Sequence, residues 1–299
     1  MYDFIKPLSV EFKDIYFVRG ERNGGYPYSN SLLIGDYLLD TGISGKYLKI
    51  LKKQFSIKNV IFSHWHEDHI SGNSLLTDCK FICHLKDKDP IEDINKIFTY
   101  YGVEGTKAGE EFRKMLGLFG MKNTVITRTI DDDEILNIDN KLKLRVIHTP
   151  GHTAGHCALY EINSKIAFFG DIDLTRFPYY ATLDSDLIEY ENSIDKLKEI
   201  DLEIAVLGHR DPISGRNNIR EELDNFKSII FKRDDRILSQ LSEQKPIQLA
   251  ELKGKNLIYK RYTFEIFEII SELIMIEKHF EKFLMKNLVI KKDNGYILN

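Results

Sequence analysis

The chain has 299 residues, a formal net charge of −4, 42% hydrophobic residues and 11% aromatic residues. This composition is ample for a packed interior, and the length allows one large domain or a large and a small one. The net charge excludes a general attraction to polyanions, so nucleic-acid binding would need a local basic patch.

Three cysteines, Cys79, Cys83 and Cys157, cannot build a disulfide framework and are typical of a reducing compartment. Cys79 and Cys83 are spaced loosely like half of a zinc site, but no second cysteine pair completes it, so we assign both to core packing. The first ten residues lack a signal-peptide pattern, and no apolar run reaches the ~18 residues of a membrane span. We therefore expect a soluble, cytoplasmic protein that does not bind membranes.

Residues 13–41 alternate short strand-like runs with glycine turns, which predicts a β-meander entering a sheet. Asp40 follows the last run, where its carboxylate either orients a metal-ligating histidine or closes an Asx turn. Apolar residues at helical spacing predict a helix over residues 45–56, and the β-branched run 59–62 predicts a buried strand. A strand, a helix and a strand in succession indicate an α/β layer.

Four candidate metal ligands, His64, His66, Asp68 and His69, follow the strand 59–62 directly. Because alternate residues of an extended chain face the same way, His64 and His66 can converge on one ion. Asp68 and His69 lie just past the turn and can reach a second ion. Imidazole and carboxylate ligands suit zinc, iron or manganese. A polar loop that is histidine-rich by chance is the alternative, although only nine histidines occur in the chain.

The segment that follows predicts helices. Residues 71–73 are expected to open a helix, and residues 91–120 read as two amphipathic helices broken between Gly102 and Gly109. Their apolar residues form either a lid over the metal-binding region or ordinary core. These residues are Tyr100, Tyr101, Phe112, Met115, Leu116 and Phe119.

Three further candidate ligands, His152, Asp171 and His209, each follow a strand-like run. His152 comes after a Pro-Gly turn and is the natural third ligand of the ion held by His64 and His66. Asp171 can bridge two cations because each carboxylate oxygen binds one, although a turn-capping role is its alternative. Strands that deliver ligands at the same kind of end indicate one shared site. The remaining histidines of these segments are read as packing or framework residues: His84, His148 and His156.

The four motifs, in this order, resemble the ligand set of the metallo-β-lactamase-fold hydrolase superfamily over about residues 10–215. The resemblance implies a four-layer αββα sandwich with a dinuclear metal site. It assigns the first metal to His64, His66 and His152. It assigns the second metal to Asp68, His69 and His209, with Asp171 as the bridging ligand.

Residues 216–299 contain few glycines and long helical patterns, and they end in a hairpin pattern with an Asn294-Gly295 turn. We predict a catalytic domain over residues 1–215 and a small winged-helix-like domain over residues 216–299. The order resembles that of glyoxalase II-like and endoribonuclease relatives within the superfamily. With 16 Lys plus Arg against 13 Asp plus Glu in residues 215–299, the tail favours packing or homodimer formation over nucleic-acid binding.

The ligand set predicts hydrolysis by a hydroxide that bridges two divalent metal ions, with zinc favoured over iron or manganese. Asp68 is expected to be catalytic as well as a ligand, because its carboxylate can orient the nucleophile or accept its proton. The expected substrate is a small molecule with a thioester, lactone or related ester-type bond. β-Lactamase activity, a diiron redox protein and a non-enzymatic winged-helix binding module are the alternatives.

Tyr179 and Tyr180 are candidate substrate-binding residues, since a hydroxyl a few residues beyond Asp171 could face the substrate carbonyl; an aromatic cluster at the core edge is the alternative. A metal-dependent (ribo)nuclease is the main alternative function. It would need cationic neighbours for phosphates, and the sequence offers Arg176, Arg210 and Arg216 near the predicted ligands.

Overall fold

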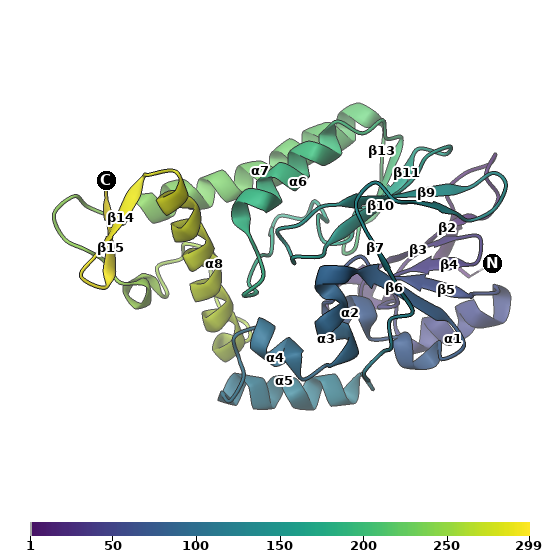
Figure 1. Ribbon diagram of the computed structural model, residues 1–299, viewed down its shortest axis with the longest axis horizontal. Helices are drawn as coiled ribbons and strands as arrows, with labels where there is room; N and C mark the ends of the chain where they lie inside the picture. Colours follow the sequence, from purple (N-terminus) through teal and green to yellow (C-terminus); the bar gives the residue numbers. More distant parts are fainter. Residues whose placement is uncertain (1) are drawn as a thin grey trace.

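The computed structural model describes residues 2–299, in which two β-sheets pack face to face between two layers of helices (Figure 1). The first sheet has seven strands: β1 (Ile5–Pro7), β2 (Ile15–Val18), β3 (Ser31–Ile34), β4 (Tyr37–Leu39), β5 (Asn59–Ile61), β6 (Lys80–His84) and β7 (Arg128–Ile130). Strands β1 to β4 pair antiparallel, which confirms the predicted meander, and β4 to β7 pair parallel.

The second sheet has six strands, in the spatial order β13 (Ile213–Ser214), β12 (Ile204–Val206), β11 (Ile166–Phe168), β10 (Cys157–Glu161), β9 (Lys143–His148) and β8 (Ile135–Asn137). Strands β11 and β12 pair parallel, and the other neighbours pair antiparallel. Parallel pairs therefore occur in both sheets. They matter for the site, because parallel strands carry the residues at their carboxyl ends to the same edge of a sheet.

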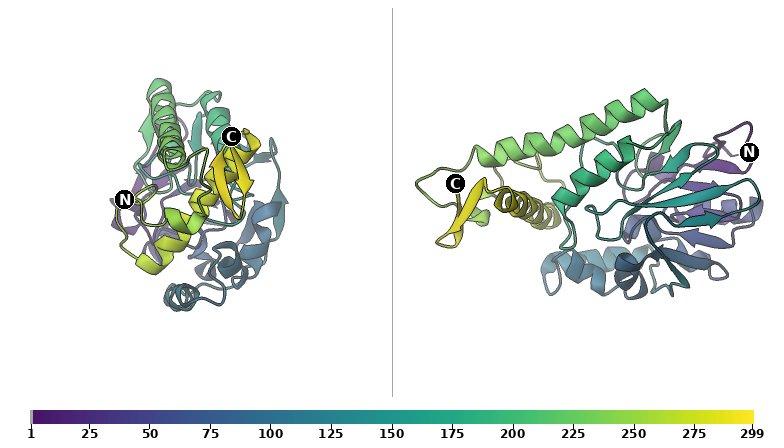
Figure 2. Two further views of the ribbon diagram at one scale, coloured as in Figure 1. Left: turned by 90° about the vertical axis from the view of Figure 1, so that its left-hand side faces the viewer. Right: turned by 45° about the horizontal axis from the view of Figure 1, so that its top comes forward.

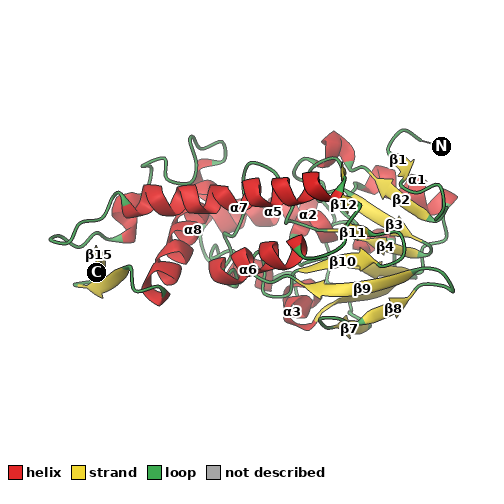
Figure 3. Cartoon of the chain, turned by 90° about the horizontal axis from the view of Figure 1, so that it is seen from above, coloured by secondary structure: helices red, strands yellow, loops and turns green. Residues whose placement is uncertain are grey.

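The two sheets bury their facing sides against each other, with Phe17 and Leu32 of one sheet in the same apolar cluster as Leu159 and Phe168 of the other. The outer side of the first sheet packs against α1 (Gly45–Gln54), α2 (Glu67–Ile70), α3 (Lys88–Glu92), α4 (Lys96–Tyr100) and α5 (Lys107–Leu118). The outer side of the second sheet packs against α6 (Leu187–Lys198) and α7 (Arg216–Leu238) (Figure 3). The predicted αββα sandwich is confirmed.

Side-chain caps explain the starts of α1, α5 and α6. The Ser44 hydroxyl caps α1 by accepting a hydrogen bond from the backbone N–H of Tyr47, as expected for a helix N-terminus. The break predicted between Gly102 and Gly109 ends earlier, at Thr106, directly before α5, and the first expected helix is divided into α3 and α4. The helix expected from residue 71 is wrong, since only a 3₁₀ turn, η2 (Asn73–Leu75), forms. The chain is held instead by the Gly72 N–H, which donates to the Thr41 hydroxyl.

The C-terminal part consists of a 3₁₀ turn, η4 (Leu249–Leu252), helix α8 (Glu265–Met285) and the antiparallel hairpin of β14 (Val289–Lys292) and β15 (Gly295–Leu298). Figure 1 and the right view of Figure 2 place the hairpin far from the sandwich, and Figure 1 shows α8 running back toward α5. One apolar cluster joins Ala205 of the second sheet, Phe226 of α7 and Phe280 of α8. A domain boundary at residue 216 stays a prediction, and the winged-helix-like character of the tail does too.

Within residues 2–299, none of the helices combines the length and the apolar content needed to cross a membrane.

Candidate metal centre

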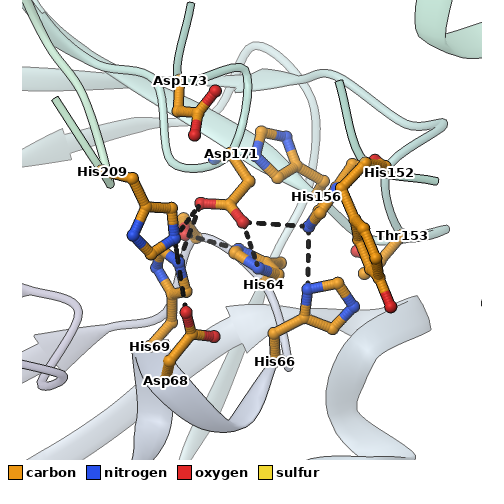
Figure 4. Close-up of polar contacts among 12 residues, drawn as sticks. His64, His66, Asp68, His69, His152, Thr153, His156, Asp171, Asp173 and His209 are labelled. Carbon is orange, nitrogen blue, oxygen red and sulfur yellow. Dashed lines mark hydrogen bonds and ion pairs between the residues drawn. The ribbon is translucent and has the colours of Figure 1, made fainter. Parts of the chain in front are cut away.

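The candidate ligands gather at one edge of the sandwich, where several strands end. Asp40 follows β4, His64 follows β5, Asp171 follows β11 and His209 follows β12. His152 comes from the loop after β9. Figure 4 shows the side chains converging from both sheets.

The first group consists of His64, His66, His152 and Asp171, whose ligand atoms all lie within 4.8 Å of one another. His152 Nε2 lies 2.9 Å from His66 Nδ1 and 3.4 Å from Asp171 Oδ2. His64 Nε2 lies 3.7 Å from the same Asp171 oxygen. The structure therefore brings together the three histidines predicted for the first metal.

The second group consists of Asp68, His69 and His209, again within 4.8 Å of one another. His209 Nε2 lies 3.3 Å from Asp68 Oδ2 and 3.3 Å from His69 Nε2. Asp171 Oδ1 lies 2.8 Å from His69 Nε2 and 3.3 Å from His209 Nε2. One Asp171 oxygen thus faces each group, as a bridging carboxylate requires.

The donor set fits metal ions. His64 Nε2 and His66 Nε2 are buried polar atoms without a hydrogen bond among the described residues. A buried polar group without a partner costs about 1–3 kcal/mol. Ring nitrogens also face each other closely, at 2.9 Å between His66 and His152. Both features follow naturally if the lone pairs point at cations, and imidazole with carboxylate suits zinc, iron or manganese.

Burial and charge separate the histidines into two kinds. Burial lowers the pKa of His64, His66 and His152 below the usual value, so these rings are neutral. Burial also opposes a charge on His69 and His209, but Asp171 and neighbouring carboxylates outweigh it. They raise the pKa of His69 well above the usual value and that of His209 to about 10. In the metal-free chain, protons on these two rings thus balance the buried carboxylates.

Asp40 orients two of the candidate ligands. Its Oδ2 lies 2.6 Å from His69 Nδ1, and it also accepts a hydrogen bond of 2.6 Å from the Ser63 hydroxyl. Ser63 Oγ in turn lies 2.9 Å from His64 Nδ1. Of the two roles considered for Asp40, the geometry therefore corresponds to orientation of ligand histidines, which typically bond such partners through their second nitrogen.

His152 is oriented differently, through the C-terminal helices. Its Nδ1–H donates to the backbone carbonyl of Tyr179 at 2.8 Å. The Arg233 guanidinium of α7 donates to the carbonyl of Pro178 at 2.6 Å and to the Tyr180 hydroxyl at 2.9 Å. Arg233 therefore fixes the chain on both sides of the carbonyl that His152 uses.

The two candidate tyrosines have different surroundings. Tyr180 is fully buried, and its hydroxyl contacts His279 Nε2 at 2.8 Å as well as Arg233. Its hydroxyl is thereby engaged in the tail rather than at the metal-binding groups. The Tyr179 hydroxyl lies 3.5 Å from the Ser271 hydroxyl of α8, but its partly buried ring lies beside the first ligand group, with its centroid 5.9 Å from that of His66. We retain only Tyr179 as a proposed substrate-binding residue.

Two carboxylates beside the ligands were missed in the sequence. Glu67 is buried between the hydroxyls of Tyr26, at 2.9 Å, and Tyr101, at 2.7 Å. Burial, followed by the Asp68 charge, raises the pKa of Glu67 to about 7. Asp87 accepts hydrogen bonds from the backbone N–H groups of Trp65 and Gly155. It thereby joins the loop that carries His64 and His66 to the loop that carries His152. The only sequence feature that could have indicated Glu67 is its position within the motif from His64 to His69. No sequence feature indicated Asp87.

The framework histidines lie outside the two ligand groups. The rings of His84 and His148 stack with centroids 4.1 Å apart. His156 Nε2 accepts a hydrogen bond of 3.1 Å from the backbone N–H of Asp171, so it supports the loop of that residue. The apolar residues assigned to a lid or to core are packed: Tyr101, Phe112 and Leu116 are buried, and Tyr101 stacks 5.4 Å from His66.

Comparisons with known proteins agree with this geometry. A family model described as the metallo-beta-lactamase superfamily matches residues 24–209. A beta-lactamase-like protein 2 homolog of Caenorhabditis elegans is 27% identical over 239 residues, covering 76% of this chain and 70% of that protein. A hydroxyacylglutathione hydrolase of Rhizobium etli is 28% identical over 120 residues, covering 40% of this chain and 35% of that protein.

A solved structure shares the fold over the full chain. A metallo-beta-lactamase family protein from Thermus thermophilus superposes with a TM-score of 0.68 at 19% identity. The match covers 100% of this chain and 98% of that one. The similarity therefore includes the C-terminal helices as well as the sandwich.

Proposed function

We propose that this chain, which belongs to the metallo-β-lactamase superfamily and is a hydrolase, uses two divalent metal ions to cleave a thioester, lactone or related ester-type bond. The observation that carries the proposal is the division of the Asp171 oxygens between two groups of candidate ligands. Zinc is the proposed metal, because sets of three nitrogen and oxygen ligands are typical of catalytic zinc.

Divalent cations in such a site lower the pKa of bound water and stabilise the charge that develops on the substrate oxygen. The protein supplies the arrangement. Asp68 Oδ2 lies 3.3 Å from His209 Nε2, and its proposed role is to orient the attacking water and to accept a proton. Tyr179 borders the first group and is proposed to contact the substrate.

The ester-type bond is favoured by a relative named for hydrolysis of hydroxyacylglutathione. The match spans about a third of that protein, so its substrate is not carried over. A small molecule is the proposed substrate. A cytoplasmic location and a homodimer stay predictions.

Metal analysis and a substrate panel test the proposal. We expect two bound ions per chain and chelator-sensitive hydrolysis of at least one thioester or lactone. His64→Ala and Asp171→Ala should lower both metal content and turnover, whereas Asp224→Asn, at an exposed position of α7, should change neither. Unchanged metal content and hydrolysis in both ligand variants would refute the assignment. Iron content with a visible absorbance band would favour the redox alternative, and β-lactams belong in the same panel.

The (ribo)nuclease alternative requires free cations beside the site. Arg210 Nη1 lies 2.6 Å from a Glu222 oxygen, and Arg216 Nη1 lies 3.1 Å from an Asp201 oxygen. Two of the three arginines that a nuclease would need are thus paired with carboxylates. Because paired arginines are less available to phosphates, these contacts favour the ester-type hydrolase. Metal-dependent cleavage of single-stranded RNA that falls steeply with salt would reverse this preference.

A further inference from the structure

A cavity of about 550 Å³ adjoins the candidate metal centre on the His209 side. It lies between the loop that follows Asp171 and helix α7, so its walls come from both the sandwich and the start of the C-terminal part. His209 forms part of its wall. An occupant of the cavity would therefore reach the second ligand group, and the volume lies in the usual range for small-molecule sites.

The polar wall of this cavity carries more positive than negative charge. Arg176 and Arg210 line it against a single carboxylate, that of Glu222. Arg210 is fixed, because its Nη1 donates to the Leu174 carbonyl at 2.7 Å and to Glu222 at 2.6 Å. Arg176 is exposed, and across residues 2–299 its side chain makes no hydrogen bond or ion pair. One guanidinium is thereby left without a counter-charge.

The remaining wall combines an amide with apolar surface. Asn225 supplies hydrogen-bond donors, and Phe226 and Ile229 form the apolar part. A planar guanidinium binds carboxylates and phosphates through two parallel hydrogen bonds. The lining thus suits a short apolar group that ends in an anion.

We propose that this cavity binds an anionic end of the substrate, a carboxylate or a phosphate, with Arg176 as its principal partner. The ester-type bond would lie beyond His209, at the metal-binding groups. This rests on the proposed function and narrows its substrate class to anionic esters or thioesters.

A pair of thioesters tests the proposal: the S-acetyl derivative of 3-mercaptopropionate and its uncharged primary amide. We expect the metal-loaded parent protein to prefer the acid by about tenfold in kcat/KM, chiefly through a lower KM, as for one charge-assisted contact. Arg176→Glu should abolish or invert the preference. Lys232→Glu, an equal charge change at an exposed residue of α7 outside the cavity lining, should retain it.

Equilibrium binding separates this inference from the proposed function. Calorimetry with succinate and with inorganic phosphate should show binding to the parent protein and to Lys232→Glu, and at least tenfold weaker binding to Arg176→Glu. Binding that persists in Arg176→Glu would overturn the inference. If no thioester is hydrolysed, the ester-type proposal fails while calorimetry still decides the anion site. Binding of phosphate alone or succinate alone identifies which anion the cavity accepts.

Discussion

His152 of the first ligand group and the two histidines of the second group are oriented by different parts of the molecule. His69 is held by the Asp40 carboxylate, and His209 Nδ1 lies 2.6 Å from the Gly24 carbonyl, so both depend on the N-terminal meander. His152 instead depends on a loop carbonyl that Arg233 of α7 fixes from both sides. The C-terminal helices are therefore part of the support of one half only.

A buried network holds these helices in place. The Tyr180 hydroxyl contacts His279, whose Nδ1 lies 2.6 Å from Asp234. Lys282 forms ion pairs with both Asp234 and Glu191, which links α8 to α7 and α6. Removing one partner of a buried pair typically costs about 3–5 kcal/mol. The network thus stabilises the tail. Both His279 and Arg233 contact Tyr180 of the loop beside His152, and Arg233 also binds the backbone carbonyl of Pro178.

The largest effect is expected at Asp171, the residue that both halves share. Asp171→Ala should release both metal ions and lower hydrolysis by about 1,000-fold or more, because metal-dependent activation of water is lost. Elemental analysis and turnover measure the two effects. If the Asp171→Ala variant loses one ion and keeps the other, one ligand group binds its ion without Asp171.

The two halves should also differ in pH dependence. The raised pKa values of His69 and His209 mean that both rings are protonated at pH 7 without metal, and an ion must displace both protons. His64, His66 and His152 release none, because burial lowers their pKa values. Affinity for the second ion should fall by about 100-fold per unit decrease in pH near pH 7, and that for the first should change little.

Calorimetric titration in buffers of different ionisation enthalpy counts these protons. Equal proton release by both ions, or none by either, would contradict the difference between the halves.

Asp40→Ala should weaken metal binding by about 50-fold, within the usual range for residues that orient ligand histidines. The affinity for the second ion should fall more than that for the first, since Asp40 contacts His69 directly and His64 only through Ser63. Stepwise competition with a chelator separates the two ions. An equal loss for both would show that the Ser63 contact matters as much as the direct one.

Arg233→Met should have the smallest effect. We expect the affinity for the first ion to fall about tenfold, the lower end of the range for residues that orient ligand histidines, and the affinity for the second ion to stay unchanged. Lys282→Met is the matched control, because it breaks the tail network without touching the loop at Tyr179. It should lower the Tm at least as much as Arg233→Met while leaving both metal affinities intact. If both variants lower the affinity for the first ion in proportion to their loss of Tm, Arg233 affects metal binding only by stabilising the fold.

The sequence alone determined which residues are candidate ligands, and the resemblance of this set to a known superfamily implied the sandwich. The candidate ligands His64 and His209 each lie two or three residues beyond an apolar strand-like run, and such strand ends are local features that the sequence pattern reveals. The helix expected from residue 71 does not form: the chain makes one 3₁₀ turn there, and the Gly72 N–H donates to the Thr41 hydroxyl, thirty-one residues away.

Only the tertiary structure decided how the ligands are supported. The hydroxyl of Tyr180 turns to His279, ninety-nine residues away, and Glu67 meets the hydroxyl of Tyr101. The placement of Arg176 and Arg210 around one cavity likewise depends on where α7 packs. Such contacts join residues far apart in the chain, and they arise from packing between layers that leaves no periodic signal in the sequence.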